Sequence, residues 1–60
     1  MDRALIARID LGRLTFQEIA KRAQEHGYRI SASLVHKVYF GDIEPSSYQR
    51  RGILKALEKK

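Results

Sequence analysis

Three glycines divide this sequence into four short segments, and their spacing restricts the chain to a small set of folds. Gly12, Gly27 and Gly41 each follow a segment in which apolar residues recur three or four positions apart, as they do along one face of a helix. Glycine commonly ends a helix because it adopts the left-handed backbone conformation without steric cost. The predicted helices span residues 2–11, 16–25, 31–40 and 47–59, and the first of them is expected to stop at Gly12.

The starts of these helices carry side chains that commonly cap a helix. Thr15 is followed three residues later by Glu18, and Ser46 by Gln49, a spacing that lets each pair satisfy free backbone amides reciprocally. Ser31 precedes the third predicted helix and is well suited to accept a hydrogen bond from its first turn. Caps and glycines thus agree on the helix boundaries. They predict an all-α, compact four-helix bundle that forms a single domain over residues 1–60.

The chain is short and has no cysteine, which limits both its core and its chemistry. A chain of 60 residues buries only about 60% of its unfolded surface, so the core is small, and neither a disulfide nor a thiolate-bound metal stabilises it. His26 and His36 have no carboxylate or cysteine at a spacing typical of metal ligands. We expect no enzymatic activity, no cofactor and no metal site. No apolar run is long enough for a membrane span or a signal peptide, so we expect a cytoplasmic protein.

Apolar positions within each segment indicate the core, and two groups of residues leave alternatives open. Gly52, inside the last helix, is either a point of close packing or a weakness that costs up to about 1 kcal/mol relative to alanine. Tyr39, Phe40 and Tyr48 are expected to join the core or form a dimer contact, in preference to stacking on unpaired bases. The residues expected to face the core are Leu5, Ile6, Ile9, Phe16, Ile19, Ala20, Ala23, Val35 and Val38, with some of Tyr48, Ile53, Leu54 and Leu57.

The charge balance is strongly basic for so short a chain. Twelve Lys and Arg residues against seven Asp and Glu residues give a net charge of +5. Such a balance favours a polyanionic partner, most often nucleic acid. A basic surface also keeps a protein soluble, so charge by itself weighs about equally for the two interpretations.

The middle of the chain meets the packing demands of a helix-turn-helix, in which the second helix is free to enter the major groove of DNA. Ile19–Ala20 supplies a large residue followed by a small one, which lets the next helix cross close by. Gly27 suits the turn and Ile30 supplies an apolar plug. Val35 and Val38 lie three apart and would face the core, which leaves the remaining early positions of their helix polar and free.

The segments that meet these demands, LTFQEIAKRA and ISASLVHKVYFGD, also resemble the Cro and lambda-repressor-like helix-turn-helix family. In that family LTxxEIA opens the first helix of the motif, and (V/I)SxSxVxKV followed by a glycine forms the recognition helix. The closing RRGILKALEK is similar to the amphipathic helix that comes next, so the resemblance extends over residues 14–57. It implies a small phage or prophage regulator that represses transcription by occluding promoter DNA.

Two features depart from the family pattern. The interval from Ala20 to Val35 is longer than in the family, so QEHGYR acts as an insertion that lengthens either the first helix of the motif or the turn. We favour an extra helical turn, because the residues after Ala20 are good helix formers. Phe16 stands where the family often has a glutamine that contacts phosphate. We expect Phe16 to pack, which leaves Gln17 as the nearest polar candidate.

The exposed side of the third predicted helix carries the candidates for reading bases. Ser33 and Lys37 lie four apart beside its first turn, and His36 flanks them. Serine and lysine bond to base edges, and Ala32 suits contact with a thymine methyl group. Leu34 either packs on the last helix or reaches such a methyl group. The candidates for contacts with the DNA backbone are Gln17, Arg29, Ser31, Arg50 and Arg51. For each of these residues, an ordinary solvated side chain is the alternative.

We therefore expect a sequence-specific regulator that binds a double-stranded DNA operator as a homodimer and inserts the helix at about 31–40 into the major groove. The dimer surface is expected on the last helix together with the YFGDIEP loop. An alternative is a small helical protein-interaction module, similar to an antirepressor or an antitoxin, that reads no bases. A third interpretation keeps DNA as the partner but makes the protein a non-specific architectural binder.

Overall fold

The four predicted helices are present in the computed structural model, which describes residues 2–58 of the chain. They are α1 (Arg3–Gly12), α2 (Phe16–Glu25), α3 (Ala32–Tyr39) and α4 (Ser47–Leu57). No strand occurs within the described range, so the predicted all-α fold class is confirmed. The last helix ends earlier than expected, because the backbone of Glu58 is extended. The predicted end at position 59 lies outside the described residues.

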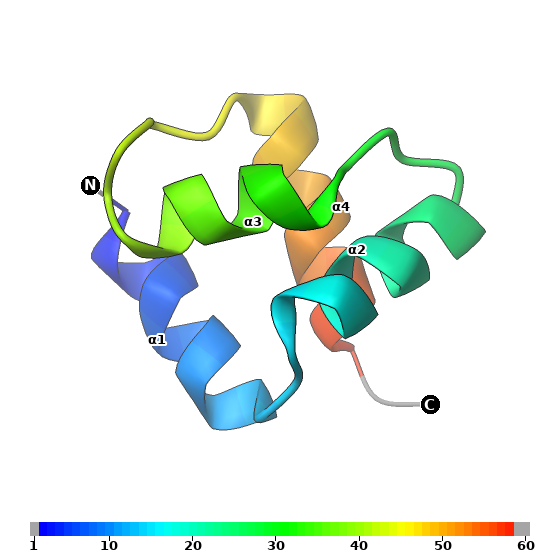
Figure 1. Cartoon of the computed structure of the whole chain (residues 1–60), viewed down its shortest axis with the longest axis horizontal. Coiled ribbons are helices and arrows are strands. Elements are labelled where there is room, and N and C mark those ends of the chain that lie inside the picture. Colours follow the sequence, from blue (N-terminus) through cyan, green and yellow to red (C-terminus); the bar gives the residue numbers. More distant parts are fainter. Residues whose placement is uncertain (1, 59–60) are drawn as a thin grey trace.

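The helices are arranged so that α1 and α2 each pack against both α3 and α4. In Figure 1, α3 crosses in front of α4, with α1 on the left and α2 on the right. The molecule measures 26 × 22 × 18 Å along its principal axes. In so small a domain each helix turns one side towards a shared core and keeps the other in solvent.

The core contains most of the apolar side chains that helical spacing singles out, with the exception of Ile6, which is only half-buried. It also includes Ala56, which the sequence analysis had not placed there, while Phe16, Leu54 and Leu57 are only half-buried at its edge. Among residues 2–58 no polar or charged side chain is buried. The buried apolar residues are Leu5, Ile9, Ile19, Ala20, Ala23, Ile30, Val35, Val38, Ile53 and Ala56.

Of the three aromatic residues expected in the core or in a dimer contact, two lie outside the core, which leaves the dimer contact as the prediction for them. Phe40 is 57% exposed and Tyr48 is 45% exposed, whereas Tyr39 is half-buried. Both exposed rings pack on another ring at the surface instead of entering the core. Phe40 meets Tyr39 edge-on at 5.0 Å between centroids, and Tyr48 lies against Tyr28 at 5.2 Å. The Tyr39 hydroxyl also donates a hydrogen bond to Asp10 Oδ1 (2.5 Å), which ties α3 to α1 and raises the pKa of Tyr39.

Glycine ends α2 and α3 as predicted. Gly27 and Gly41 have φ of 88° and 79°, in the left-handed region. At the end of α2, the Tyr28 N–H donates to the Ala23 carbonyl (2.9 Å) and the Gly27 N–H donates to the Gln24 carbonyl (2.9 Å). This is the hydrogen-bond pattern of a Schellman motif, in which two otherwise free carbonyls of the last turn are satisfied.

The end of α1 differs from the prediction. Gly12 does not stop the helix but forms its last residue, and the left-handed conformation falls on Arg13, whose φ is 54°. A Cβ atom at Gly12 would lie 2.9 Å from Leu57 Cδ2, so this glycine allows α4 to approach α1 closely. Packing against α4, rather than backbone freedom, therefore explains the glycine at position 12.

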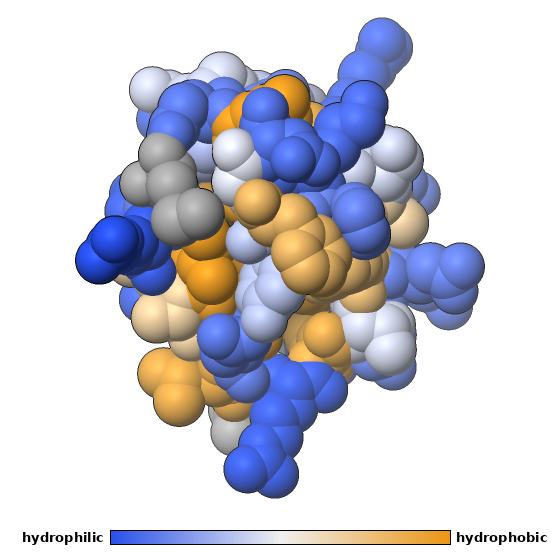
Figure 2. Space-filling model, turned by 60° about the vertical axis from the view of Figure 1, so that its left-hand side comes forward, coloured by the Kyte–Doolittle hydropathy of each residue, from blue (hydrophilic) through white to orange (hydrophobic). Residues whose placement is uncertain are grey.

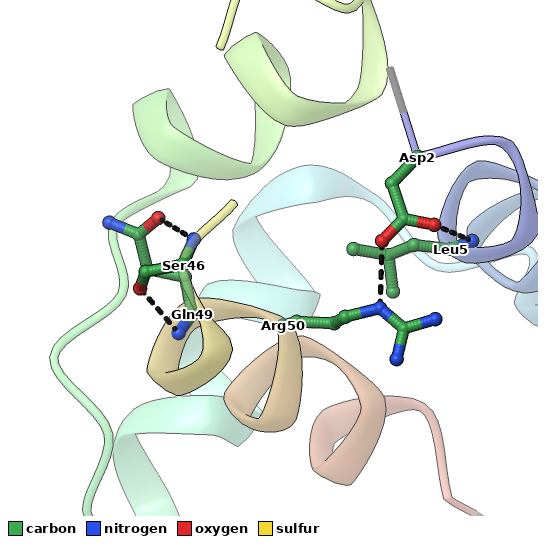
Figure 3. A network of polar contacts seen from close by, with 5 residues as sticks. All are labelled: Asp2, Leu5, Ser46, Gln49 and Arg50. Carbon is green, nitrogen blue, oxygen red and sulfur yellow. Dashed lines mark hydrogen bonds and ion pairs between the residues drawn. The ribbon is translucent and has the colours of Figure 1, made fainter. Parts of the chain in front are cut away.

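The predicted capping boxes are both confirmed. Ser46 Oγ accepts a hydrogen bond from the Gln49 N–H (3.2 Å), and Gln49 Oε1 accepts one from the Ser46 N–H (2.9 Å), as Figure 3 shows. Thr15 and Glu18 make the same reciprocal pair at the start of α2, with distances of 3.1 and 3.0 Å. Each pair satisfies two amides that the first turn leaves without a partner.

A further cap, which the sequence did not predict, joins the start of α1 to α4. Asp2 Oδ1 accepts a hydrogen bond from the Leu5 N–H (3.1 Å), while Asp2 Oδ2 pairs with Arg50 Nε at 2.7 Å (Figure 3). The hydrogen bond from Arg50 is the largest cause that lowers the pKa of Asp2 below its ordinary value, and the Leu5 amide adds to it.

The lowered pKa of Asp2 predicts an acid-sensitive contribution to stability. A carboxylate whose folded-state pKa is depressed stabilises the fold above its unfolded-state pKa, and this contribution is lost as the pH falls through the folded-state pKa. We expect the melting temperature of the unmodified protein to fall more steeply below about pH 4 than that of Asp2→Asn. Thermal denaturation followed by circular dichroism at several pH values measures this. Parallel curves for the two proteins would contradict the contribution of Asp2.

Candidate nucleic-acid interface

The exposed side of α3 is set by two buried valines on its other side. Val35 and Val38 are fully buried, so α3 is fixed against α1 and α2. Ser33, His36 and Lys37, three of the residues expected to read bases, are all exposed. Because Ser33 and Lys37 are four residues apart, they lie on the same face of the helix.

The first turn of α3 is capped as predicted. Ser31 Oγ accepts a hydrogen bond from the Leu34 N–H (3.1 Å), and Ser31 itself is exposed. Ala32 is half-buried, so it presents less surface to a partner than the other three candidates for base readout. Leu34 is also half-buried and packs against the core, so its side chain is not a freely projecting apolar contact.

Aromatic packing holds His36 and shows where the start of α2 lies. The His36 ring is 4.7 Å from that of Phe40 and meets the ring of Phe16 edge-on at 5.6 Å. Phe16 also lies against Tyr39 at 5.4 Å and is half-buried, so it packs as the sequence predicted. The start of α2, including the exposed Gln17, is therefore beside the second half of α3.

The segment that joins α2 to α3 contains the residues that departed from the family pattern. α2 runs to Glu25, and residues 26–31 form a connection without helix. The Gln24 side chain donates from Nε2 to the Ile30 carbonyl (2.9 Å), which spans the connection. A shallow surface groove runs beside it, lined by Gln24, Gly27, Tyr28, Arg29, Ile30, Ser31 and Leu34.

Gly52 on α4 lies against this connection. Its surroundings decide whether this glycine is a point of close packing or a local weakness of the helix. Gly52 is buried, and a Cβ atom there would lie 2.3 Å from Ile30 Cδ1 and 2.9 Å from Tyr28 Cγ. The absence of a side chain thus lets the connection lie directly on α4. Gly52 is a point of close packing.

The cationic candidates for DNA backbone contacts are differently placed. Arg29, in the connection, and Arg51, on α4, are exposed, and among residues 2–58 neither has an acidic partner. Arg51 lines a second groove, together with Tyr28, Ser47, Arg50, Leu54, Lys55 and Glu58. Arg50 is exposed as well, but its Nε is paired with Asp2. The prediction for Arg50 therefore competes with a contact within the protein.

Sequence reasoning missed the contribution of α4 to the connection. Tyr48 and Gly52 both contact residues far from them in the sequence, and helical periodicity carries no signal for such contacts. The one available signal was a glycine at position 52, inside a helix that otherwise has good caps.

Within residues 2–58, no His, Asp and Glu side chains gather in a group of three or more suited to a metal ion. None of the helices in that range is both long and apolar enough to span a membrane. The chain matches no protein-family model, no curated protein and no solved structure.

Proposed function

We propose that this protein is a sequence-specific DNA-binding regulator of the Cro type that inserts α3 into the major groove of double-stranded DNA. The observation that carries the proposal is the division of α3 into two sides. Val35 and Val38 are buried, while Ser33 and Lys37 project from the opposite side. An α-helix fits the major groove, and hydroxyl and ammonium groups bond to base edges there. A regulator of this kind, working inside the host cell, represses by occluding a promoter.

The charge of the molecule supports the same proposal. Its net charge is +5, and among residues 2–58 Arg29, Lys37 and Arg51 have no acidic partner. Neutralising phosphates with such side chains releases the counterions that surround DNA. We therefore propose Arg29 and Arg51, with the free amides at the start of α3 and Gln17, as contacts to the DNA backbone.

A homodimer completes the proposal. One module of this size offers few base contacts, and two copies on a palindromic operator double them. The exposed aromatic ring of Phe40 lies at the start of the segment that was expected to form the dimer surface. Sedimentation equilibrium with and without operator DNA tests this part of the proposal directly.

The test of the proposed function is selection from a pool of randomised duplexes, followed by affinity measurements at several salt concentrations. We expect the unmodified protein to enrich one sequence. Lys37→Gln should weaken its binding about tenfold or more, since one good base contact is worth about 1–3 kcal/mol. Ser33→Ala should lower the preference for the selected sequence. Arg51→Gln should weaken all duplexes alike and reduce the slope of log K against log salt by about 0.9.

Arg22→Gln is the matched control, because it removes the same charge elsewhere. Arg22 lies on α2 beside Ala56 and Glu58, away from the exposed side of α3. It should leave the preference for the selected sequence unchanged. If no sequence is enriched while all duplexes bind, the protein is a non-specific architectural binder. If no duplex binds at all, the DNA-binding proposal fails.

Exposed apolar side chains favour a second candidate function, a helical module that binds another protein. Leu11 is 79% exposed and Phe40 is 57% exposed. Figure 2, which brings forward the side of the molecule that carries α1, shows apolar side chains between hydrophilic ones. In this case Phe40→Ser would abolish binding to the partner, and Lys37→Gln would have no effect on DNA, because no DNA would be bound.

A further inference from the structure

We propose that Tyr48, on α4, is a positioning residue that fixes the α2–α3 connection and so sets the angle at which α3 is presented. The effect on DNA recognition rests on the function proposed above. The contact itself is a property of the fold, and it is testable without DNA. Tyr48 is exposed and so does not belong to the core, and its hydroxyl takes no part in the capping of α4.

The central observation is a hydrogen bond between distant parts of the chain. The backbone N–H of Arg29 donates to the hydroxyl oxygen of Tyr48 at 2.9 Å, although the two residues are 19 positions apart. Arg29 lies in the middle of the connection, two residues before the Ser31 cap of α3. A shift of the backbone at Arg29 therefore moves the first turn of α3, which carries Ser33.

Packing around the hydrogen bond brings Tyr48 to this place. The ring of Tyr28 lies against that of Tyr48, with 5.2 Å between centroids and 54° between planes. Tyr28 and Ile30 in turn lie on the bare backbone of Gly52, one helical turn further along α4. These apolar contacts hold the connection on α4 but are not directional. The hydrogen bond adds direction, because it weakens steeply when donor and acceptor lose their alignment.

The connection is thus fixed at three points. Gly27 closes the end of α2, and the Gln24 side chain holds the Ile30 carbonyl (2.9 Å). Tyr48 holds the amide between these two points and is the one of the three that belongs to α4. The longer connection is therefore ordered relative to the body of the domain, and Tyr48 ties the orientation of α3 to α4.

Tyr48→Phe tests the proposal, because it removes the hydroxyl and keeps the ring. Tyr28→Phe is the matched control, since it makes the same change on the adjacent ring, whose hydroxyl has no hydrogen bond within residues 2–58. Hydrogen exchange measured by NMR should show the Arg29 amide exchanging about 3- to 10-fold faster in Tyr48→Phe. The same amide in Tyr28→Phe should match the unmodified protein.

Affinity for DNA gives the second measurement. With the duplex selected by the unmodified protein, Tyr48→Phe should bind about tenfold more weakly. With a duplex of scrambled sequence, the affinity and the salt dependence should stay unchanged, because no phosphate contact is lost. A residue with a purely structural role would lower the melting temperature and weaken both duplexes together.

The outcomes separate this inference from the proposed function. If the unmodified protein binds no DNA, the proposed function fails and the exchange of the Arg29 amide still decides whether Tyr48 fixes the connection. If that amide exchanges equally in all three proteins, the inference is overturned even where DNA binding is specific. An equal loss of affinity for both duplexes would also overturn it, because Tyr48 would then be either a purely structural residue, if the melting temperature falls as well, or a direct contact to the DNA backbone, if it does not.

Discussion

Replacement of Gly52 by alanine is expected to lower the free energy of unfolding by about 2 kcal/mol, although alanine is the better helix former. The added methyl group would lie 2.3 Å from Ile30 Cδ1 and 2.9 Å from Tyr28 Cγ. Ile30 is fully buried, and the Tyr28 atom lies close to its own backbone, so neither gives way without moving the connection. Chemical denaturation followed by circular dichroism measures the change, which corresponds to a fall in melting temperature of about 10 °C for a domain of this size.

A double-mutant cycle with Ile30→Val isolates the cause. Valine lacks Cδ1, the atom that the new methyl group would meet most closely, so Gly52→Ala should cost less in an Ile30→Val background. Ile30→Val by itself should cost about 0.5–1.5 kcal/mol. If the cost of Gly52→Ala is the same in both backgrounds, Ile30 is not what requires the glycine. If Gly52→Ala is stabilising, the close approach itself is contradicted.

Truncation of Ile19 should have the largest effect on stability, because Ile19 is fully buried on α2, which packs against both α3 and α4. Ile19→Ala should lower the free energy of unfolding by about 2–5 kcal/mol. A domain of this length has only about 3–9 kcal/mol in total, so this single substitution should remove a large part of its stability.

Leu11→Ala is the matched control for Ile19→Ala. It also shortens an aliphatic side chain, but Leu11 is 79% exposed. Its cost should stay within about 0.5 kcal/mol, as is usual for surface positions. Urea denaturation of both variants gives the comparison. Equal losses for the two positions would contradict the core as described.

The helix boundaries were predictable from the sequence because they depend on local interactions. Ser46 and Gln49 satisfy each other's amides within a single turn, so their spacing carries the signal. Gly27 and Gly41 likewise end helices through hydrogen bonds to the preceding turn. Most of the core was also predictable, because the apolar residues of each segment recur at helical spacing and so mark the side that faces the core. Ser33 and Lys37 were placed on the exposed side of α3 because the two valines fix its rotation.

Contacts between distant residues could not be predicted in this way. The pair Asp2–Arg50 joins residues 48 positions apart, whereas the sequence had made Arg50 a candidate for contact with the DNA backbone. Tyr48 was expected in the core or in a dimer contact because it is aromatic, yet its position depends on where the connection meets α4. The glycine at position 12 is likewise explained by Leu57, in another helix, which leaves no room for a Cβ atom there. In each case the deciding neighbour lies on a different element.

The support that α4 gives to the connection has a consequence for the order in which the chain acquires its structure. During synthesis α2 and α3 leave the ribosome first, while Tyr48 and Gly52 are still to come. Until they arrive, the two helices have their own caps but lack the surface on which residues 28–30 rest. Nascent chains that stop before Ser47 would therefore contain every residue proposed to read bases and still not hold them in a defined orientation.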